Sequence, residues 1–322
     1  MVMEMQIRVS LGSAVVLGLA RAKMVEKPST CYLLMAGDCR SDCGFCPQAR
    51  SSQSDHKWLS RISWPTFEVA DLLRPEQVQL LQNSFARICI QTVIGPQRVS
   101  QLHELVGKIR KTPGLAEIPI SSSLLPESTE EVGRLLQAGL DRIGIPLDAA
   151  TPWVFHQTKN GDYSRVYRLI KEAALTYPGK ISTHLIIGLG ETEADAAEIL
   201  KDFWSVGVRV GLFAFTPVPG TRLAKLPPPP LDQYRRIQVL NYLLASGLPL
   251  ELSFSADGQI RDFGYSRSEL EGLLSAGTAF RTSGCPGCNR PYYNERPGQT
   301  FYNYPRPLTG IEIEKAFADL DL

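Results

Sequence analysis

The chain has almost no excess of charge of either sign. Its 322 residues carry 34 lysines and arginines against 33 aspartates and glutamates, which gives a formal net charge of +1. Proteins that bind nucleic acid in bulk carry a clear basic excess, so the charge gives no indication of a nucleic-acid partner. The same balance does not indicate strong electrostatic steering towards a protein partner.

The chain also lacks an apolar run long enough to cross a membrane. The most apolar stretch lies at residues 9–20, with Glu4 before it and Arg21 and Lys23 after it. A membrane-spanning helix needs about 20 apolar residues, and this run is shorter. We therefore expect no membrane association, and a helix within an N-terminal segment, residues 1–29. The sequence shows no solenoid-type repeat and no clear domain linker.

Three of the seven cysteines lie in one short run. Cys39, Cys43 and Cys46 have the spacing C-x3-C-x2-C, and Phe45 precedes the third. Three thiolates on one loop can hold three irons of a [4Fe–4S] cube and leave the fourth iron open for a small molecule. Zinc sites usually show two C-x2-C pairs or a Cys/His mixture, and no second pair is close in sequence. The pattern predicts an iron–sulfur site. Because its thiols must stay reduced, we expect a cytoplasmic protein.

Apolar, β-rich runs alternate with helical patterns along most of the chain. This alternation is typical of a parallel sheet with helical crossovers. Eight units predict an α/β fold, a closed (β/α)8 TIM-type barrel over residues 30–282, with residues 283–322 as a C-terminal extension. The cysteine loop follows the first predicted strand and so lies at the mouth of the barrel. The predicted strands are residues 31–37, 87–93, 118–123, 141–147, 180–187, 208–215, 250–255 and 278–281; the helices are 74–84, 100–111, 128–139, 164–177, 192–206 and 231–246.

A glycine-rich turn ends the fifth predicted strand. Gly188 and Gly190, before Glu191, let the backbone approach a ligand closely at a helix N-terminus. Together with the C-x3-C-x2-C run, this turn resembles the radical S-adenosylmethionine (SAM) superfamily. The run Cys46-Pro47-Gln48-Ala49-Arg50 with Gly188-Leu189-Gly190-Glu191-Thr192 is similar to the biotin synthase group, over about residues 30 to 290.

The resemblance implies a cofactor and a set of residues around it. The open iron would take the amino and carboxylate groups of SAM, and reduction by a donor such as ferredoxin or flavodoxin would release a 5′-deoxyadenosyl radical. Asp148 matches an acid near the SAM ribose, although Pro146 stands where the family pattern has an asparagine. Arg165 matches an arginine that pairs with the SAM carboxylate, or it is a solvated helix charge. The residues expected at SAM are Phe45, Asp148, Arg165, Gly188, Gly190 and Glu191.

The resemblance also implies that biotin synthesis is disfavoured. A biotin synthase holds a [2Fe–2S] cluster with three cysteines and an arginine, and Cys89 matches the first position. The other positions fall near residues 121–123, Ser182 and Ser253, so one ligand of four is retained.

Other cysteines indicate a different second cluster. Cys285 and Cys288 form a C-x2-C hook after the predicted eighth strand. A cube needs a third ligand, from Cys31 or Cys89, and the alternation along the first strand predicts that Cys31 faces the barrel interior. Alternatively, the pair is a structural zinc hook and the other two cysteines are inert buried thiols.

A radical SAM barrel with a second cluster resembles one subunit of the two-protein lipoyl synthases. That family implies sulfur insertion into an octanoyl (or mercapto-octanoyl) chain on a lipoyl carrier domain or H-protein-like substrate, with two [4Fe–4S] clusters, SAM and a second subunit. Ser283 resembles a serine that ligates the sulfur-donating cluster in the classical enzyme, or it is a plain turn serine. The alternatives are a biotin synthase-like enzyme, including biotin synthase itself or a metallocofactor maturase, and a non-catalytic iron–sulfur protein.

Two further features, the tail at residues 290–296 and His184, each have two possible roles. The aromatic and basic tail at residues 290–296 either wraps the surface, which we expect, or shapes the entrance to the barrel. His184 on the fifth strand points inward by its parity with Ile186. It is either a hydrogen-bonded core histidine or a contact for substrate or SAM.

Overall fold

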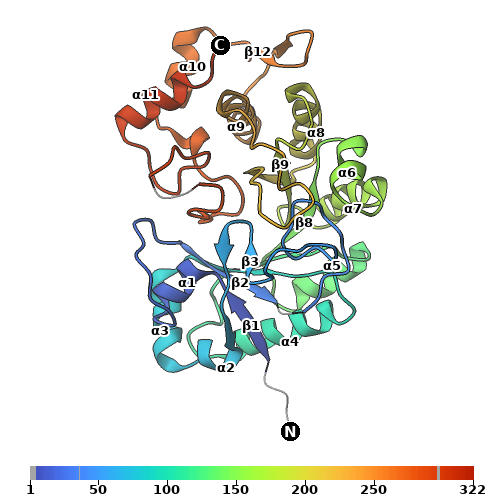
Figure 1. Ribbon diagram of the computed structural model, residues 1–322, viewed down its shortest axis with the longest axis vertical. Helices are drawn as coiled ribbons and strands as arrows, with labels where there is room; N and C mark the ends of the chain where they lie inside the picture. Colours follow the sequence, from blue (N-terminus) through green and yellow to red (C-terminus); the bar gives the residue numbers. More distant parts are fainter. Residues whose placement is uncertain (1–4, 36, 296–297) are drawn as a thin grey trace.

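The computed structural model describes residues 5–35, 37–295 and 298–322. An eight-stranded sheet with strand order β10-β9-β8-β7-β6-β2-β1-β5 forms its centre (Figure 1). Six neighbouring strands run parallel, and β1 pairs antiparallel with both β2 and β5. The α/β fold of barrel type with a mostly parallel sheet is therefore confirmed. The strands of this sheet are β1 (Gln6–Val9), β2 (Thr30–Met35), β5 (Thr66–Glu68), β6 (Arg87–Gln91), β7 (Ile120–Ser123), β8 (Arg142–Asp148), β9 (Ile181–Ile187) and β10 (Arg209–Ala214).

Most helices follow strands of the sheet and cover its outer face, whereas α10 and α11 pack against each other in the C-terminal region (Figure 1). Several begin where a side chain caps the first turn; in α8 Thr192 and Asp195 form a capping box. The helices are α1 (Leu11–Val16), α2 (Val69–Leu72), α3 (Pro75–Ser84), α4 (Arg98–Lys111), α5 (Thr129–Gln137), α6 (Pro152–Thr158), α7 (Tyr163–Thr176), α8 (Glu193–Ser205), α9 (Leu231–Ala245), α10 (Arg267–Leu274) and α11 (Gly310–Ala318). Within the described residues, none of these helices combines the length and apolar character needed to cross a bilayer.

The last two predicted strands are wrong. Residues 250–255 contain only β11 (Ser253–Phe254), which pairs with β12 (Ile260–Asp262) in a separate, largely exposed hairpin. Thr278–Phe280 is a 3-10 helix that follows Gly277, whose φ of +66° suits a left-handed turn. The N-terminal segment differs too, because β1 joins the sheet before the short helix α1 begins.

The C-terminal extension covers the open edge of β10. The backbone N–H of Leu212 donates to Ser283 Oγ at 2.8 Å, and Arg290 Nη2 donates to the Leu212 carbonyl at 3.2 Å. Asn294 Nδ2 donates to the Ala214 carbonyl at 2.5 Å. Of the strands that the structure describes, none neighbours β10 on this side. Side chains from residues 283–294 therefore form the hydrogen bonds with its backbone N–H and C=O groups.

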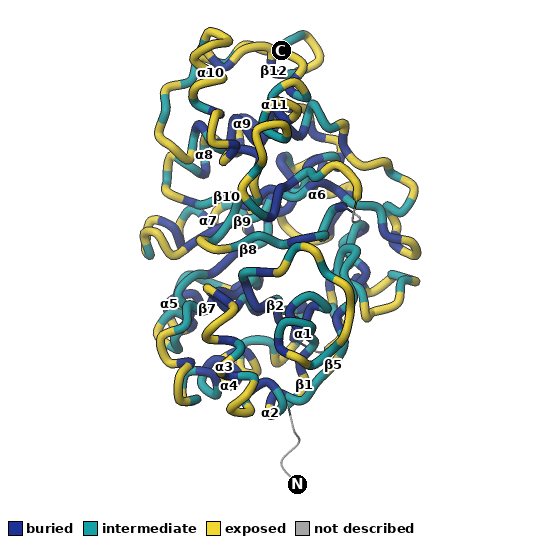
Figure 2. The backbone as a smooth tube through the Cα atoms, turned by 90° about the vertical axis from the view of Figure 1, so that its left-hand side faces the viewer, coloured by how far each residue is buried: buried dark blue, intermediate teal, exposed yellow. Residues whose placement is uncertain are grey.

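Both faces of the central strands are buried (Figure 2). On β2, Cys31, Leu33 and Met35 belong to the large core between sheet and helices. Tyr32 and Leu34 point the other way, into the barrel, and pack in a smaller cluster with Trp64 and Val93. The hairpin of β3 (Trp58–Leu59) and β4 (Ile62–Ser63) contributes Leu59 and Ile62 to the edge of that cluster.

Candidate active site

The loop with the first three cysteines is fixed from two sides. Asn160, just after α6, accepts hydrogen bonds from the Ser41 hydroxyl at 2.8 Å and the Asp42 backbone N–H at 2.6 Å. The Gly44 N–H donates to the Thr158 carbonyl at 2.7 Å. A Cβ on Gly44 would lie 2.8 Å from the guanidinium carbon of Arg222, so a larger residue would displace that side chain. Neither Asn160 nor Arg222 was predicted, because their role depends on contacts distant in sequence.

The thiols of this loop suit an iron–sulfur cluster. Burial raises the pKa of Cys43 and of Cys46, and the charge of Cys39 raises both further. These thiols are therefore neutral unless a metal stabilises the thiolates. Among the described residues, no three His, Cys, Asp or Glu side chains converge as a site for a single metal ion. All the sulfurs that bind a single zinc ion must lie about 2.3 Å from that ion. In a [4Fe–4S] cube each thiolate binds a different iron, so the sulfurs can lie further apart. The donor set fits the cube.

Asp148 is held beside this loop by a buried cation. It ends β8 with a φ of +70°, in the left-handed region, and is 9% exposed. Its Oδ2 lies 2.8 Å from Lys159 Nζ, which also donates to the Pro146 carbonyl at 2.7 Å. Lys159 therefore fixes both Asp148 and the backbone at Pro146, where the family pattern has an asparagine. No sequence pattern indicated this role for Lys159.

The glycine turn after β9 is closed by its own glutamate. Gly188 and Gly190 have φ values of +98° and +118°. The carboxylate of Glu191 accepts from the N–H of Gly188 at 2.6 Å and from that of Leu189 at 3.0 Å. Glu191 thus shapes the turn from within. The side chain of Trp153 lies 3.5 Å from where a Cβ of Gly190 would be.

Arg165 has local partners. Its backbone N–H donates to the capping residue Asp162, and its Nη2 donates to the Glu127 carbonyl at 3.0 Å. Neither Arg165 nor the three residues predicted in the glycine turn is among the described residues that line the cavity below. Their contact with SAM stays a prediction.

We expect Gly188→Ala to destabilise the fold and weaken SAM binding. A Cβ at this position would lie 2.7 Å from Pro229 Cδ, in addition to the strain of the positive φ. The strain costs about 1–2 kcal/mol and the overpacking about 1–3 kcal/mol more.

Gly179→Ala is the matched control, since Gly179 has a φ of +74° but no atom within 4 Å of its Cβ position. Urea unfolding and equilibrium dialysis of SAM measure the two effects. Equal losses of stability in the two variants would show that contact with Pro229 does not constrain the turn.

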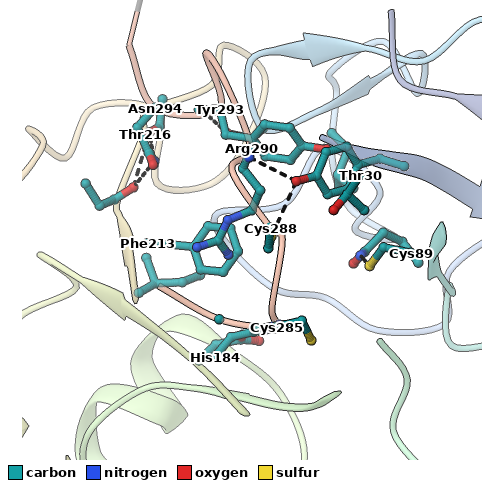
Figure 3. A pocket seen from close by; sticks show the side chains of 18 of the residues that line it. Thr30, Cys89, His184, Phe213, Thr216, Cys285, Cys288, Arg290, Tyr293 and Asn294 are labelled. Atoms are coloured by element: carbon teal, nitrogen blue, oxygen red, sulfur yellow. Dashed lines mark hydrogen bonds between the residues drawn. The ribbon is translucent and has the colours of Figure 1, made fainter. Parts of the chain in front are cut away.

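A cavity of about 210 Å³ runs through the barrel interior (Figure 3). Phe45, Cys46 and Asp148 contribute to it from segments at the C-terminal ends of the strands. Thr30, Arg87, Ser121 and Ser182 contribute from the first or second residue of β2, β6, β7 and β9. The cavity therefore extends along the barrel axis, from the mouth towards the N-terminal ends of the strands.

A second set of thiols lines the same cavity. Cys89 on β6 joins Cys285 and Cys288 of the C-terminal extension (Figure 3). Burial raises the pKa of Cys89 to about 12, with a further contribution from the charges of Cys285 and Cys288. Cys288 Sγ shares a hydrogen bond with the Tyr32 hydroxyl at 3.3 Å, and Gln91 Nε2 donates to Cys89 Sγ at 3.1 Å.

Positive charge surrounds these thiols. Arg87 is 7% exposed and donates from Nε to the Pro286 carbonyl at 3.2 Å. Its buried Nη1 has no hydrogen-bond partner among the described residues. The positive charge of Arg290 opposes the rise that burial causes in the pKa of Cys288. Three soft donors with buried cations suit an anionic thiolate cluster.

Two predicted ligands of the second cluster lie elsewhere. Cys31 is fully buried on the helix-facing side of β2, next to Leu33 and Met35, so the prediction that it faces the barrel interior is wrong. Its strand neighbour Tyr32, one residue on, lines the cavity instead. The hydroxyl oxygen of Ser283 accepts the N–H of Leu212, which gives it the role of an edge-bonding serine.

The tail lines the cavity, contrary to the expected surface wrap. The guanidinium carbon of Arg290 lies 3.7 Å from the ring centroid of Phe213. Tyr293 packs on Tyr32 with ring centroids 5.6 Å apart, and Asn294 donates to Thr216 Oγ1 at 2.9 Å. Residue 296, at the end of this tail, lies outside the described residues. His184 also lines the cavity, as predicted from its position two residues before Ile186 on the same face of the strand.

Comparison with known proteins agrees with this geometry. A biotin synthase of Christiangramia forsetii is 24% identical, over 73% of this chain and 65% of that protein. A lipoyl synthase of Chlamydia abortus is 23% identical, over 78% of this chain and 80% of that protein. The crystal structure of HydG, a maturase of the [FeFe]-hydrogenase, aligns with a TM-score of 0.54 at 12% identity over 67% of this chain and 49% of that chain, which is a likeness of fold.

The chain thus spans about two thirds of the biotin synthase and about half of the maturase. The model of the radical SAM superfamily matches residues 33–203, more than half of the sequence. The chain belongs to the radical SAM superfamily.

Proposed function

We propose that this chain inserts sulfur into a protein-bound octanoyl (or mercapto-octanoyl) chain during lipoyl cofactor biosynthesis, as one subunit of a two-protein lipoyl synthase. As a radical SAM protein related at low identity to both biotin and lipoyl synthases, it is expected to hold one [4Fe–4S] cluster and SAM. The proposed sulfur donor is a second [4Fe–4S] cluster on Cys89, Cys285 and Cys288. One observation carries the proposal: these three thiols and Cys46 line the same cavity.

The chain's own residues suit the handling of a hydrocarbon. When bound, the first cluster and SAM would supply hydrogen abstraction, and the second cluster would supply sulfide. The wall of the cavity that both sets of thiols line also includes Ile186, Phe213 and Phe215. Apolar side chains of this kind hold an alkyl chain by burial and exclude water, so the reacting carbon can be aligned with both groups.

Biotin synthesis is less well supported, although the biotin synthases match as well as the lipoyl synthases do. Two of the positions where the resemblance implies cluster cysteines, Ser121 and Ser182, do line the cavity. Their hydroxyls are poor substitutes for thiolates in an iron–sulfur site. The remaining ligand position falls near Ser253, in the exposed β11–β12 hairpin.

The remaining parts of the proposal follow from this chemistry. The acyl chain would arrive on a lysine of a lipoyl carrier domain or H-protein-like substrate, and ferredoxin or flavodoxin would supply electrons in the cytoplasm. Residues 283–322 would form a cluster-binding extension of the barrel. Arg235, fully buried on α9, supports such a unit because its guanidinium donates to the carbonyls of Phe301 and Tyr302 at 2.5 and 2.7 Å.

Anaerobic turnover tests the proposal. The reconstituted chain is given SAM, reductant and one of two peptides, carrying octanoyl-lysine or singly thiolated octanoyl-lysine. Mass spectrometry of the products should show one added sulfur on one of the peptides, together with 5′-deoxyadenosine. Deoxyadenosine formation without sulfur transfer to either peptide would contradict the proposal and favour another radical SAM reaction, such as metallocofactor maturation. Absence of deoxyadenosine with every substrate would favour a non-catalytic iron–sulfur protein.

A further inference from the structure

His184 lines the cavity at a position where the neighbouring strands leave space. The neighbouring strands carry glycines beside it: Gly211 on β10 is its register partner, and Gly144 lies on β8. A Cβ on Gly144 would lie 3.5 Å from both Cε1 and Nε2 of the imidazole, and one on Gly211 would lie 3.5 Å from Cδ2. The two glycines therefore leave room for the imidazole, and neither flanking position covers it with a side chain.

Gly211 lies between the imidazole and the segment that carries Cys285. The Cβ position of Gly211, 3.5 Å from the imidazole, is also 3.6 Å from the Cα of Gly284, the residue before Cys285. His184 and Cys285 both line the cavity, and Figure 3 labels the two side chains. Phe213 fixes the ring from another side, edge to face, with centroids 5.3 Å apart and planes at 80°.

The nitrogens of His184 are available for a ligand. The hydrogen bonds within the described part of the chain include none to either ring nitrogen. The side chain lines the same cavity as Cys89, Cys285 and Cys288. Imidazole nitrogen is a common ligand of iron, so His184 can join these thiols in a metal site.

We propose that His184 is the fourth protein ligand of the second cluster, beside Cys89, Cys285 and Cys288. This inference rests on the proposed function, because it requires that cluster to exist. Other candidates from the sequence have different roles: Ser283 bonds the edge of β10, and Cys31 faces the helices. An imidazole in place of a fourth thiolate makes the cluster less negative. Replacement of thiolates by imidazole raises the reduction potential of iron–sulfur centres, as the Rieske centres illustrate.

The test uses the full chain with Cys39→Ala, Cys43→Ala and Cys46→Ala, so that only the second site can hold iron. After anaerobic reconstitution we expect about four irons per chain. Pulsed EPR of the reduced cluster should show strong coupling to a directly bound nitrogen. Adding His184→Cys should retain the iron, abolish this coupling and lower the midpoint potential. Adding His156→Cys, at an exposed position on α6, should change neither property.

The outcomes separate this inference from the proposed function. A cluster of about four irons whose spectrum is the same with and without the substitution His184→Cys would overturn the ligation by His184 and leave the second cluster standing. Failure of the triple variant to hold iron would overturn the second cluster itself, and the role of His184 with it.

Discussion

Replacing Cys285 and Cys288 with alanine should lower the iron content from about eight to about four atoms per chain. Both thiols line the cavity with Cys89, and a single remaining thiol cannot hold a cube. Sulfur transfer should fall to background, whereas 5′-deoxyadenosine formation should continue, because the site at Cys39, Cys43 and Cys46 is untouched. Iron analysis and product mass spectrometry of the same preparation measure both effects.

Cys31→Ala is the matched control for this experiment. Cys31 is as buried as any residue of the core, but it packs between the sheet and the helices, away from the cavity. Its removal should cost about 1 kcal/mol of stability and leave iron content and sulfur transfer unchanged. Loss of iron in Cys31→Ala, or full iron in the double variant, would contradict the assignment of the second site.

Lys159→Met should cost about 3–5 kcal/mol of unfolding free energy, which is typical for removal of one partner from a buried ion pair. The Lys159 and Asp148 side chains are only 6% and 12% exposed, and the variant would leave the Asp148 carboxylate without its cation. Asp148 also has a left-handed backbone that Lys159 supports through the Pro146 carbonyl. We therefore expect weaker SAM binding as well. Urea unfolding and equilibrium dialysis measure the two losses.

The control is the half-exposed pair of Lys171 and Asp202, whose side chains are 30% and 29% exposed at an N–O distance of 2.7 Å. Lys171→Met should cost about 0–1 kcal/mol, since solvent screens such a pair. It should not alter SAM binding, because Lys171 on α7 and Asp202 on α8 are not among the residues predicted at SAM. If the two lysine variants were equally stable, the pair at Asp148 would not hold the site in place.

Strands with a helix on one side and the barrel interior on the other were predictable. β2, β6, β7, β8, β9 and β10 all fall close to the predicted ranges, because continuous apolar runs are typical of buried parallel strands. The two ends of the sheet were not predictable. β1 has only four residues, and its place beside β2 depends on antiparallel pairing at long range. The edge of β10 is covered by side chains, which no strand pattern reveals.

In the site, too, local sequence patterns were informative, whereas contacts between distant residues were not predictable. Cys39, Cys43 and Cys46 could be predicted as cluster ligands because the pattern that indicates them is a short local spacing, and this assignment stays a prediction. The direction of Cys31 was predicted wrongly because all six residues of β2 are buried, so alternation carries no information about which face is which. Lys159 and Asn160 were missed because they act through contacts with residues more than ten and more than a hundred positions away.

The origin of the inserted sulfur decides whether the second set of thiols holds the sulfur donor. The chain is reconstituted with iron and heavy-isotope sulfide, freed of unbound sulfide, and given SAM, reductant and the peptide that accepted sulfur. The product should carry the heavy isotope, in an amount no greater than one sulfur per second cluster, and the variant lacking Cys285 and Cys288 should form no such product. A product with light sulfur from another source would show that the second set of thiols does not hold the sulfur donor.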